Sequence, residues 1–270
     1  MAARKKQKQR WVVKLGSGIL TNSRGGVDLA QIKHLAAQVK TLKAEGVDVI
    51  LVSSGAVSAG MTVLGLDERP QERTALQACA SIGQPVLMKS YEKEFSKAGL
   101  HSAQILLTYW DLDSRQLYKN TQATIEHLLE LGTCVPIVNE NDALSFEEIE
   151  MLNRFGDNDR LSAHVALLAK ANALIILSSI DGLYENPDAT GELIPFVKKI
   201  DSSIQASAGT TQSQRSVGGM ISKLETARMM MDAGIPMILA NGRRKQVLTD
   251  LFAGVEIGTL FAKKKWSRKL

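Results

Sequence analysis

Cysteine and histidine are scarce in this chain. Only two cysteines, Cys79 and Cys134, occur among its 270 residues. Two separate thiols do not make the disulfide framework of a small secreted domain, so they favour a reducing compartment, and we expect a cytoplasmic protein. The histidines have no metal-ligand spacing, and we interpret all four as structural (His34, His101, His127 and His164). The sequence therefore predicts neither a reactive thiol nor a metal site built from protein side chains.

Long apolar runs are also missing. The longest, such as residues 173–177, fall far below the roughly 20 apolar residues that a membrane-spanning helix needs. The N-terminus is basic but no apolar segment follows it, so we expect no signal peptide. Apolar residues make up 44% of the chain and charged residues 23%, which is ordinary for a soluble globular protein. The composition therefore argues against a membrane protein.

The net charge of +5 hides two basic ends. Residues 1–10 contain five Lys and Arg, residues 263–270 contain five more, and neither stretch contains an acid, so residues 11–262 carry a net charge of −5. We expect a mildly acidic folded domain over 11–262, between a basic N-terminal tail and a basic C-terminal tail. Solvated chain ends explain these tails most simply. Contact with RNA or an anionic surface is the alternative.

Strand and helix patterns alternate along the body. Short apolar runs rich in β-branched residues predict strands, at residues 11–15, 47–52, 103–107, 135–138, 173–177 and 235–239. Amphipathic stretches predict helices at residues 29–45, from 72 onward, 114–131, 158–170 and 219–233. Asp28 and Gly46 fit the ends of the first helix, Gly83-Gln84-Pro85 is expected to break the second, and turn signals predict a β-hairpin within 182–196. The alternation predicts one α/β domain: a mostly parallel sheet with helices on both faces.

Three segments of small or polar residues directly follow predicted strands. They are residues 16–18, 53–60 and 139–142. Because ligands bind beyond the carboxyl ends of parallel strands, these segments should gather around one site. The small residues Ser53-Ser54-Gly55-Ala56 offer hydroxyl and backbone groups to a carboxylate, although a tight turn would use the same residues. Neither GxGxxG nor GxxxxGK[ST] occurs, so the site has no standard nucleotide motif.

Two lysines beside glycines are candidates for binding phosphate. Lys14 precedes the turn Gly16-Ser17-Gly18, where backbone N–H groups can approach phosphate oxygens. Lys223 lies one turn into a predicted helix that starts with a double glycine, so backbone N–H groups and a lysine would face one anion; the segment is Val217, Gly218, Gly219, Met220, Ile221, Ser222 and Lys223. An ordinary strand-to-helix turn and a surface lysine are the alternatives.

Carboxylates and carboxamides in NEND (139–142) and FGDND (155–159) are candidates for binding an amino acid. Asp142 can accept an ammonium group, and Asn158, which both donates and accepts, can orient either end of the ligand. Helix capping could explain one of these side chains. It would not explain the whole set of Asp157, Asn158, Asp159 and NEND.

The chain resembles the amino acid kinase family, and within it the branch that phosphorylates glutamate, in six segments taken in order: KLGSG, SSGAVSAG, NEND, FGDNDRLSA, DGLY and GGMISK. The combination is highly specific, although no single segment is. The resemblance covers nearly the whole body and implies a three-layer α/β/α sandwich around a mainly parallel sheet, in a homo-oligomer. It also implies ATP-dependent phosphorylation of the side-chain carboxylate of L-glutamate to L-glutamyl 5-phosphate, the first step of proline biosynthesis, with Mg²⁺ bound mainly through ATP.

The resemblance also implies roles for individual residues. Lys14 and Lys223 would bind ATP phosphates and stabilise the transferring phosphoryl group, and Asp159 would organise both lysines. Glutamate would be held by Ser54, Gly55, Ala56, Asp142 and Asn158. The nucleotide would contact Lys14, Gly16, Ser178, Ser179 and residues 217–223. In such a reaction positioned cations must screen two anions from each other, whereas an ionised carboxylate needs no general base.

The chain departs from the family pattern in several places. Ser178-Ser179 stands where many relatives have Thr-Asp, and Val217 stands where relatives often have glycine, so we expect effects on nucleotide preference and a stiffer phosphate loop. Residues 143–154 look longer than usual, in a region that affects inhibition by proline in the family. The chain is expected to lack the C-terminal PUA domain of many bacterial relatives. The alternatives are a sibling kinase acting on acetylglutamate, aspartate or a nucleoside monophosphate, and a non-catalytic protein whose basic tails bind RNA.

Overall fold

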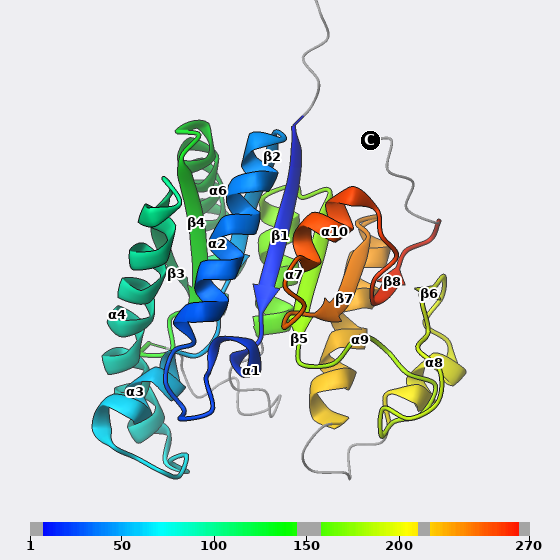
Figure 1. The fold of residues 1–270 in the computed structure, drawn as a ribbon, viewed down its shortest axis with the longest axis horizontal. Coiled ribbons are helices and arrows are strands. Elements are labelled where there is room, and N and C mark those ends of the chain that lie inside the picture. The colour runs from blue at the N-terminus through cyan, green and yellow to red at the C-terminus, as the bar shows by residue number, and fades with distance from the viewer. Residues whose placement is uncertain (1–7, 145–157, 210–216, 265–270) are drawn as a thin grey trace, which may run out of the picture.

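An eight-stranded sheet organises the part of the chain that the structure describes. The computed structural model describes residues 8–144, 158–209 and 217–264. The strands are β1 (Gln9–Leu15), β2 (Val47–Val52), β3 (His101–Leu107), β4 (Cys134–Glu140), β5 (Ala173–Ser178), β6 (Phe196–Val197), β7 (Met237–Asn241) and β8 (Thr259–Phe261). They lie in the order β3-β4-β2-β1-β5-β7-β8-β6 (Figure 1). The pairing is parallel throughout, except between β7 and β8.

The strand order reverses at β1. The chain passes from β1 to β2 on one side and later returns to β5 on the other side of β1. In open parallel sheets, ligands bind beyond the carboxyl ends of the strands at such a point. The fold therefore places the expected site near Leu15, Val52 and Ser178, the last residues of β1, β2 and β5.

Helices cover both faces of the sheet (Figure 1). One layer contains α1 (Ser17–Leu20), α2 (Leu29–Ala44), α4 (Arg73–Lys97) and α10 (Val247–Ala253), with α3 (Ala56–Leu64) packed on α4. The other contains α5 (Tyr109–Asp113), α6 (Arg115–Glu130), α7 (Asn158–Leu168), α8 (Ser202–Ser207) and α9 (Val217–Asp232). Side chains alternate along β1, so Trp11 and Val13 enter the first core and Val12 the second. The predicted three-layer α/β/α sandwich is confirmed.

Local signals end several helices as the sequence predicts. The Asp28 carboxylate accepts a hydrogen bond from the Gln31 N–H at 3.0 Å and caps α2, and Gly46, at φ +83°, follows its last turn. Tyr184 and Leu193 form one antiparallel bridge of the predicted hairpin. Both cysteines are free thiols. None of the described helices is long and apolar enough to cross a bilayer.

The predicted break at Gly83-Gln84-Pro85 is wrong. α4 continues from Arg73 to Lys97 with Pro85 inside it. Proline lacks the N–H that would bond to the carbonyl of Ser81, but Ser81 and Pro85 are exposed, so water can hydrate that carbonyl. Gly83, on the buried side of the same turns, packs directly on α3. Tertiary packing therefore outweighs the loss of one helical hydrogen bond.

Two predicted boundaries are also corrected. Residues 53–60 are not a loop throughout, because α3 begins at Ala56 after Gly55, which has φ +97°. Arg10 does not belong to a solvated tail: β1 begins at Gln9, and the Arg10 guanidinium lies 2.6 Å from the Glu126 carboxylate. The folded body therefore starts before residue 11.

Candidate active site

A cleft of about 540 Å³ opens at the carboxyl edge of the sheet. The segments that follow β1, β2, β4 and β5 line it, together with the first turns of α7 and α9. Most of the candidate residues from the sequence lie on its wall: Lys14, Gly16, Ser54, Gly55, Ala56, Asn139, Asp142, Asn158, Ser178, Ser179, Gly219, Met220 and Lys223. The fold thus brings residues from distant parts of the chain to one place.

Asp159 lies between two lysines beside this cleft. The Lys14 Nζ is 2.6 Å from one carboxylate oxygen of Asp159, and the Lys223 Nζ is 3.0 Å from the other. Lys14 points toward α7 because it follows Val12 by two residues along β1. Asp159 is in the first turn of α7, and Lys223 is in the neighbouring helix α9. One carboxylate therefore fixes the separation of two lysines from different elements.

Burial and charge act in opposite directions on Asp159, which is only 3% exposed. Burial alone raises the pKa of this carboxyl group, but the charges and hydrogen bonds of Lys14 and Lys223 outweigh burial and lower the pKa below its ordinary value. The carboxyl group therefore stays ionised, and the three side chains keep one net positive charge. The Lys223 Nζ also donates to the carbonyl of Gly219 at 3.0 Å, which holds it against the start of α9.

A second polar cluster surrounds Asn158, the first residue of α7. Its Nδ2 donates to the Ser53 carbonyl at 2.9 Å and to the Ser54 hydroxyl at 3.0 Å, and it lies 3.3 Å from the Asn139 Oδ1. Asn139 in turn donates to the Gln84 side chain at 2.9 Å. Asn158 is buried and Ser54 half-buried. The carboxyl ends of β2 and β4 are thus joined to α7 and α4 by amide side chains.

Comparison with known proteins assigns this arrangement to a family. The model of the amino acid kinase family matches residues 9–241. The chain belongs to the amino acid kinase family. The glutamate 5-kinase of Geobacter sulfurreducens is 46% identical over 258 residues, which cover 94% of this chain and 67% of that protein. The glutamate 5-kinase of Clostridium acetobutylicum is 43% identical over 94% of this chain and 95% of that protein.

A solved structure shares the fold of this amino acid kinase. The UMP kinase from Bacillus anthracis has a TM-score of 0.60 and 14% sequence identity, over 95% of this chain and 97% of that one. The glutamate 5-kinase of Thermus thermophilus, from the curated relatives, is 47% identical over 94% of this chain and 67% of that protein. The three curated relatives therefore share one name and a sequence identity to this chain of 43–47%. The solved structure, at 14% identity, supports the fold alone.

Within this kinase fold, the residues predicted on the nucleotide side fall into three groups besides Lys14 and Lys223. Gly16, Ser178, Ser179, Gly219 and Met220 line the cleft. The Gly16 N–H donates to the Leu177 carbonyl at 3.1 Å, and a β-carbon at Gly16 would lie 3.4 Å from the same oxygen. Ile221 and Ser222 lie in α9 but not on the described cleft wall. Val217 and Gly218 begin α9, and their side chains lie outside the description.

Asp142 lies on the cleft wall beyond β4. Burial raises the pKa of its carboxyl group to about 6, although the nearby charge of Arg69 acts to lower it. A carboxyl group with this pKa changes its charge just below neutral pH. It is therefore suited to bind a cation and sensitive to acid.

The sequence did not reveal part of the cleft wall at the start of α4. These residues are Arg69, Arg73, Leu76 and Gln77. One signal was present: Arg73 is in the first turn of α4, where the helix dipole disfavours a cation. A ligand or neighbouring anion can offset that cost. The two arginines add positive charge to the cleft wall, and Arg69 lies near enough to Asp142 to act on its pKa.

Some predictions fall outside the described residues. Phe155, Gly156 and Asp157 of FGDND belong to the undescribed segment 145–157, as does most of the segment 143–154. Among the residues that the structure describes, no group of three or more His, Cys, Asp or Glu side chains could hold a metal ion.

Proposed function

We propose that this chain transfers the γ-phosphoryl group of ATP to the side-chain carboxylate of L-glutamate and forms L-glutamyl 5-phosphate, the first step of proline biosynthesis. The observation that carries the proposal is the pair Lys14 and Lys223 held by buried Asp159, beside the amide cluster around Asn158. The similarity to proteins named glutamate 5-kinase supports glutamate as the acceptor.

The lysine pair answers the main physical difficulty of this reaction. The acceptor carboxylate and the γ-phosphate are both anions, so they repel each other as they approach. Positioned cations lower that repulsion and stabilise the charge on the transferring group. Lys14 and Lys223 approach Asp159 from two elements, so their ammonium groups are fixed before the substrates bind. The acceptor carboxylate is already ionised at neutral pH, so no general base is required.

The two substrates take opposite sides of the lysine pair in this proposal. Asp142 accepts the ammonium group of glutamate, and Asn158, Ser54, Gly55 and Ala56 orient its carboxylates. ATP lies over the Gly16 turn, residues 178–180 and the start of α9. A second carboxylate of the substrate needs a donor, and Arg69, whose charge acts on Asp142, is the candidate, with Arg73 on the same cleft wall.

Mg²⁺ enters the site on the phosphates of ATP in this proposal. A cation that keeps several waters and binds substrate phosphates needs few protein ligands. Asp159 is already engaged by two lysines at 2.6 and 3.0 Å, and Asp142 lies on the amino-acid side. When bound, the ion would supply further neutralisation of phosphate charge. By family resemblance, we also propose a cytoplasmic homo-oligomer, a dimer or a tetramer.

A hydroxamate assay tests the proposal directly. The protein is incubated with ATP, Mg²⁺ and hydroxylamine, which traps acyl phosphates, with L-glutamate, N-acetylglutamate or aspartate as the acceptor. We expect hydroxamate from L-glutamate and background values from the other two. Preference for N-acetylglutamate or aspartate would instead identify a sibling kinase. No product from any acceptor would reject the proposed function and leave two alternatives: a kinase acting on a nucleoside monophosphate, and a binding protein, for which RNA binding that weakens with salt is the signature.

A further inference from the structure

We propose that Asn241, Gly242 and Arg243 form a clasp that fixes the two nucleotide-side loops of the cleft relative to each other, with Arg243 as a positioning residue for ATP. The loops are residues 16–18 after β1 and residues 178–180 after β5, and both line the cleft. The three residues, called the Asn241–Arg243 clasp below, lie at the end of β7. The inference deepens the proposed function, on which the identity of the ligand rests.

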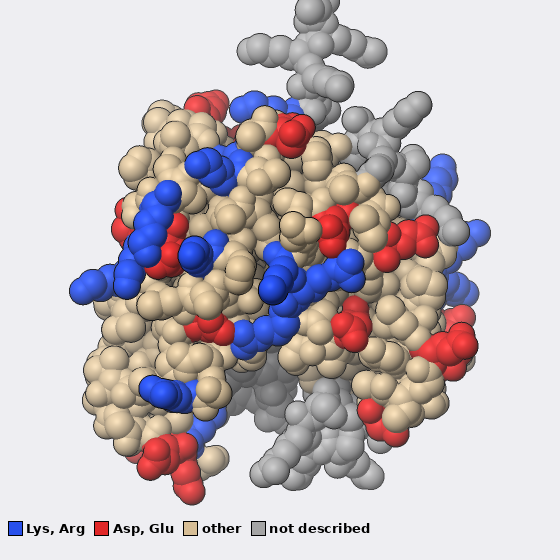
Figure 2. Space-filling model, viewed as in Figure 1, with Lys and Arg blue, Asp and Glu red and all other residues tan. Residues whose placement is uncertain are grey.

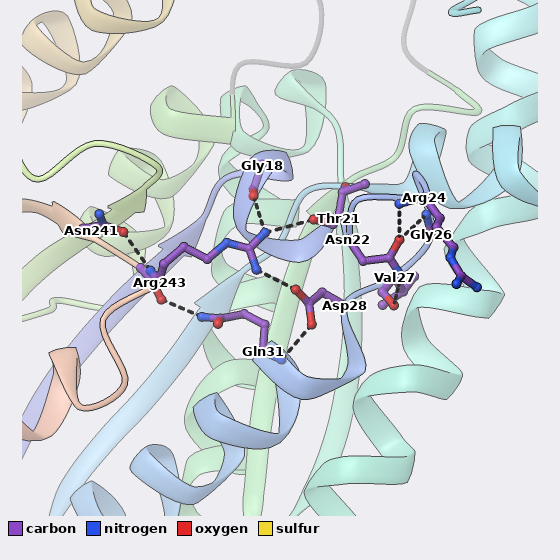
Figure 3. Close-up of polar contacts among 11 residues, drawn as sticks. Gly18, Thr21, Asn22, Arg24, Gly26, Val27, Asp28, Gln31, Asn241 and Arg243 are labelled. Atoms are coloured by element: carbon purple, nitrogen blue, oxygen red, sulfur yellow. Dashed lines mark hydrogen bonds and ion pairs between the residues drawn. The ribbon is translucent and has the colours of Figure 1, made fainter. Parts of the chain in front are cut away.

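Arg243 holds the first loop through α1 (Figure 3). Its guanidinium donates to the carbonyl of Gly18 at 2.8 Å and to the carbonyl of Thr21 at 2.9 Å. The other terminal nitrogen lies 2.5 Å from the Asp28 carboxylate. Asp28 also caps α2, so the guanidinium joins α1 to the start of a long helix. Hydrogen bonds from a charged donor are among the stronger ones, and a planar fork fixes direction as well as distance.

The turn that begins at Gly16 needs this support. α1 has four residues, too few to satisfy its own carbonyl groups or to be stable alone. A β-carbon at Gly18 would have no neighbour within 4 Å, so side-chain packing does not hold that residue in place. Two of the carbonyls at the end of this turn are the ones that Arg243 binds. The buried side chains of Ile19 and Leu20 anchor α1 in the core, and Arg243 adds the side-chain contact that holds the Gly18 carbonyl beside the cleft.

The other half of the clasp holds the second loop. The Gly242 N–H donates to the Ser178 carbonyl at 2.9 Å. The Asn241 side chain donates to the Asp181 carboxylate at 3.0 Å and accepts from the Arg243 N–H at 2.9 Å. A β-carbon at Gly242 would lie 3.0 Å from Leu177 and 3.1 Å from Ile19, the residues that adjoin the two loops. The same three-residue segment thus contacts both loops, and a side chain at Gly242 would be crowded by the residues that adjoin them.

Arg243 differs from the cations beside it in sequence. Arg243, Arg244 and Lys245 are all exposed, and Figure 2 shows basic side chains running across this face of the molecule. Neither arginine lines the cleft itself, but Arg244 pairs with Asp250, in α10, at 3.0 Å and not with the loop after β1. The Arg243 side chain remains 41% exposed, and such ion pairs contribute little to global stability. Its effect should therefore be local to the nucleotide side of the cleft.

The test compares Arg243→Gln with Arg244→Gln, which removes the same group one residue away. The readouts are KM for ATP, KM for glutamate, thermal unfolding, and calorimetric Kd for a non-hydrolysable ATP analogue with Mg²⁺ in the absence of glutamate. For Arg243→Gln we expect KM for ATP and Kd to rise about tenfold, because the loop residues that contact ATP lose their fixed position, and a displacement of about 1 Å costs up to about 100-fold. We expect KM for glutamate to change less than twofold, and Arg244→Gln to match the wild type.

A second variant separates positioning from folding. Asp28→Asn keeps an oxygen to cap α2 but removes the charge that Arg243 contacts, so it should weaken nucleotide binding in the same direction with little change in melting temperature. The proposal is overturned if Arg243→Gln leaves KM for ATP and Kd within twofold of the wild type, or if both KM values rise in step with a loss of folded protein. Nucleotide binding is measured without an acceptor. If the wild type binds nucleotide but does not phosphorylate glutamate, the proposed function is rejected, and the positioning role of Arg243 can still be tested by Kd.

Discussion

The buried carboxylate of Asp159 holds Lys14 and Lys223 close together at the cleft. Without Asp159, two ammonium groups held this close would repel each other and spread apart. With it, the net charge is one and both lysines keep short, directed contacts at 2.6 and 3.0 Å. Such a trio is costly to build into a protein for stability alone, because each charge loses hydration on burial. Its place on the wall of a cleft is better explained by an anionic ligand.

Lys223 is expected to matter mainly in the transition state. Removing its ammonium group leaves the transferring phosphoryl group with one fewer positioned cation, so Lys223→Ala should lower kcat by roughly 10³-fold. Steady-state kinetics with both substrates varied measures the effect. Lys40→Ala, an exposed lysine on α2, is the control and should change kcat less than twofold. A loss smaller than tenfold for Lys223→Ala would remove Lys223 from the catalytic role.

Asp142 should make kcat/KM for glutamate depend on pH. Its pKa is raised to about 6 by burial, so the carboxylate that accepts the ammonium group is lost as pH falls through that value. We expect kcat/KM for glutamate to fall about tenfold per pH unit below pH 6, while the KM for ATP changes little. Asp142→Asn should raise the KM for glutamate and remove this limb of the profile. If only the KM for ATP rose, the two sides of the cleft would have been assigned the wrong way round.

The same pKa fixes the sign of a stability effect at Asp142. A carboxyl group whose pKa is higher in the folded state binds protons more tightly when folded, so stability falls as pH rises from its ordinary value of 3.8 toward about 6. Asp142→Asn should therefore raise the melting temperature at pH 8 and change it less at pH 4. Lower binding together with higher stability would mark Asp142 as a residue kept for function.

At the scale of elements, the close crossing of α3 and α4 positions the predicted glutamate loop. A β-carbon at Gly83 would lie 1.9 Å from the Ala56 carbonyl, and one at Gly60 would lie 1.8 Å from the Cys79 carbonyl. No side chain fits at either place, so the two helices pack backbone to backbone. Ala56 begins α3 directly after Ser54 and Gly55, which line the cleft. Any displacement of α3 must therefore move that part of the cleft.

Gly83→Ala tests this coupling between packing and substrate binding. The added methyl group forces α3 and α4 apart, which we expect to cost about 1–3 kcal/mol of stability. The KM for glutamate should rise, while the KM for ATP stays within twofold, since the nucleotide loops follow β1 and β5. Lys89→Ala, at an exposed position of the same helix, is the control. Equal changes in both KM values would show that the crossing does not act on one substrate alone.

Elements with strong local signals were predictable from the sequence, and elements decided by contacts between distant segments were not. Strands such as β2 were predictable because all of their residues are buried, and α2 because Asp28 and Gly46 mark its ends. α4 was mispredicted because a local rule about Pro85 was outweighed by packing at Gly83, which no local pattern records. Arg69 and Arg73 were missed for a related reason: only the folded chain shows that they line the same cleft as Asp142. Contacts between distant segments therefore limit what the sequence reveals.

On the scale of the whole molecule, the two edges of the sheet differ in their chemistry. The cleft lies at the carboxyl edge of the sheet. The opposite edge, where β1 starts (Figure 1), carries an ion cluster centred on Arg10. The Arg10 guanidinium donates to Glu126 of α6 at 2.6 and 2.9 Å and to the Ala169 carbonyl at 2.6 Å, and it lies 3.4 Å from Asp48 of β2. This cluster ties the sheet to the α6–α7 layer, far from the substrates.

Arg10→Ala should therefore lower stability without changing catalysis. It leaves partly buried carboxylates unpaired, and after discounting the buried-pair cost for the exposure of Glu126 we expect a loss of about 2 kcal/mol, or about 4–8 °C in melting temperature. The hydrogen bond from Arg10 is the main cause that lowers the pKa of Glu126, so its contribution is present above pH 4.5 and lost at lower pH. The stability difference between wild type and variant should narrow as pH falls below 4.5.

Lys8→Ala, an exposed neighbour, is the matched control for Arg10→Ala. Deletion of residues 1–7 and 265–270 should leave both melting temperature and kcat unchanged. A loss of activity with either change would contradict this separation of stability and catalysis between the two edges.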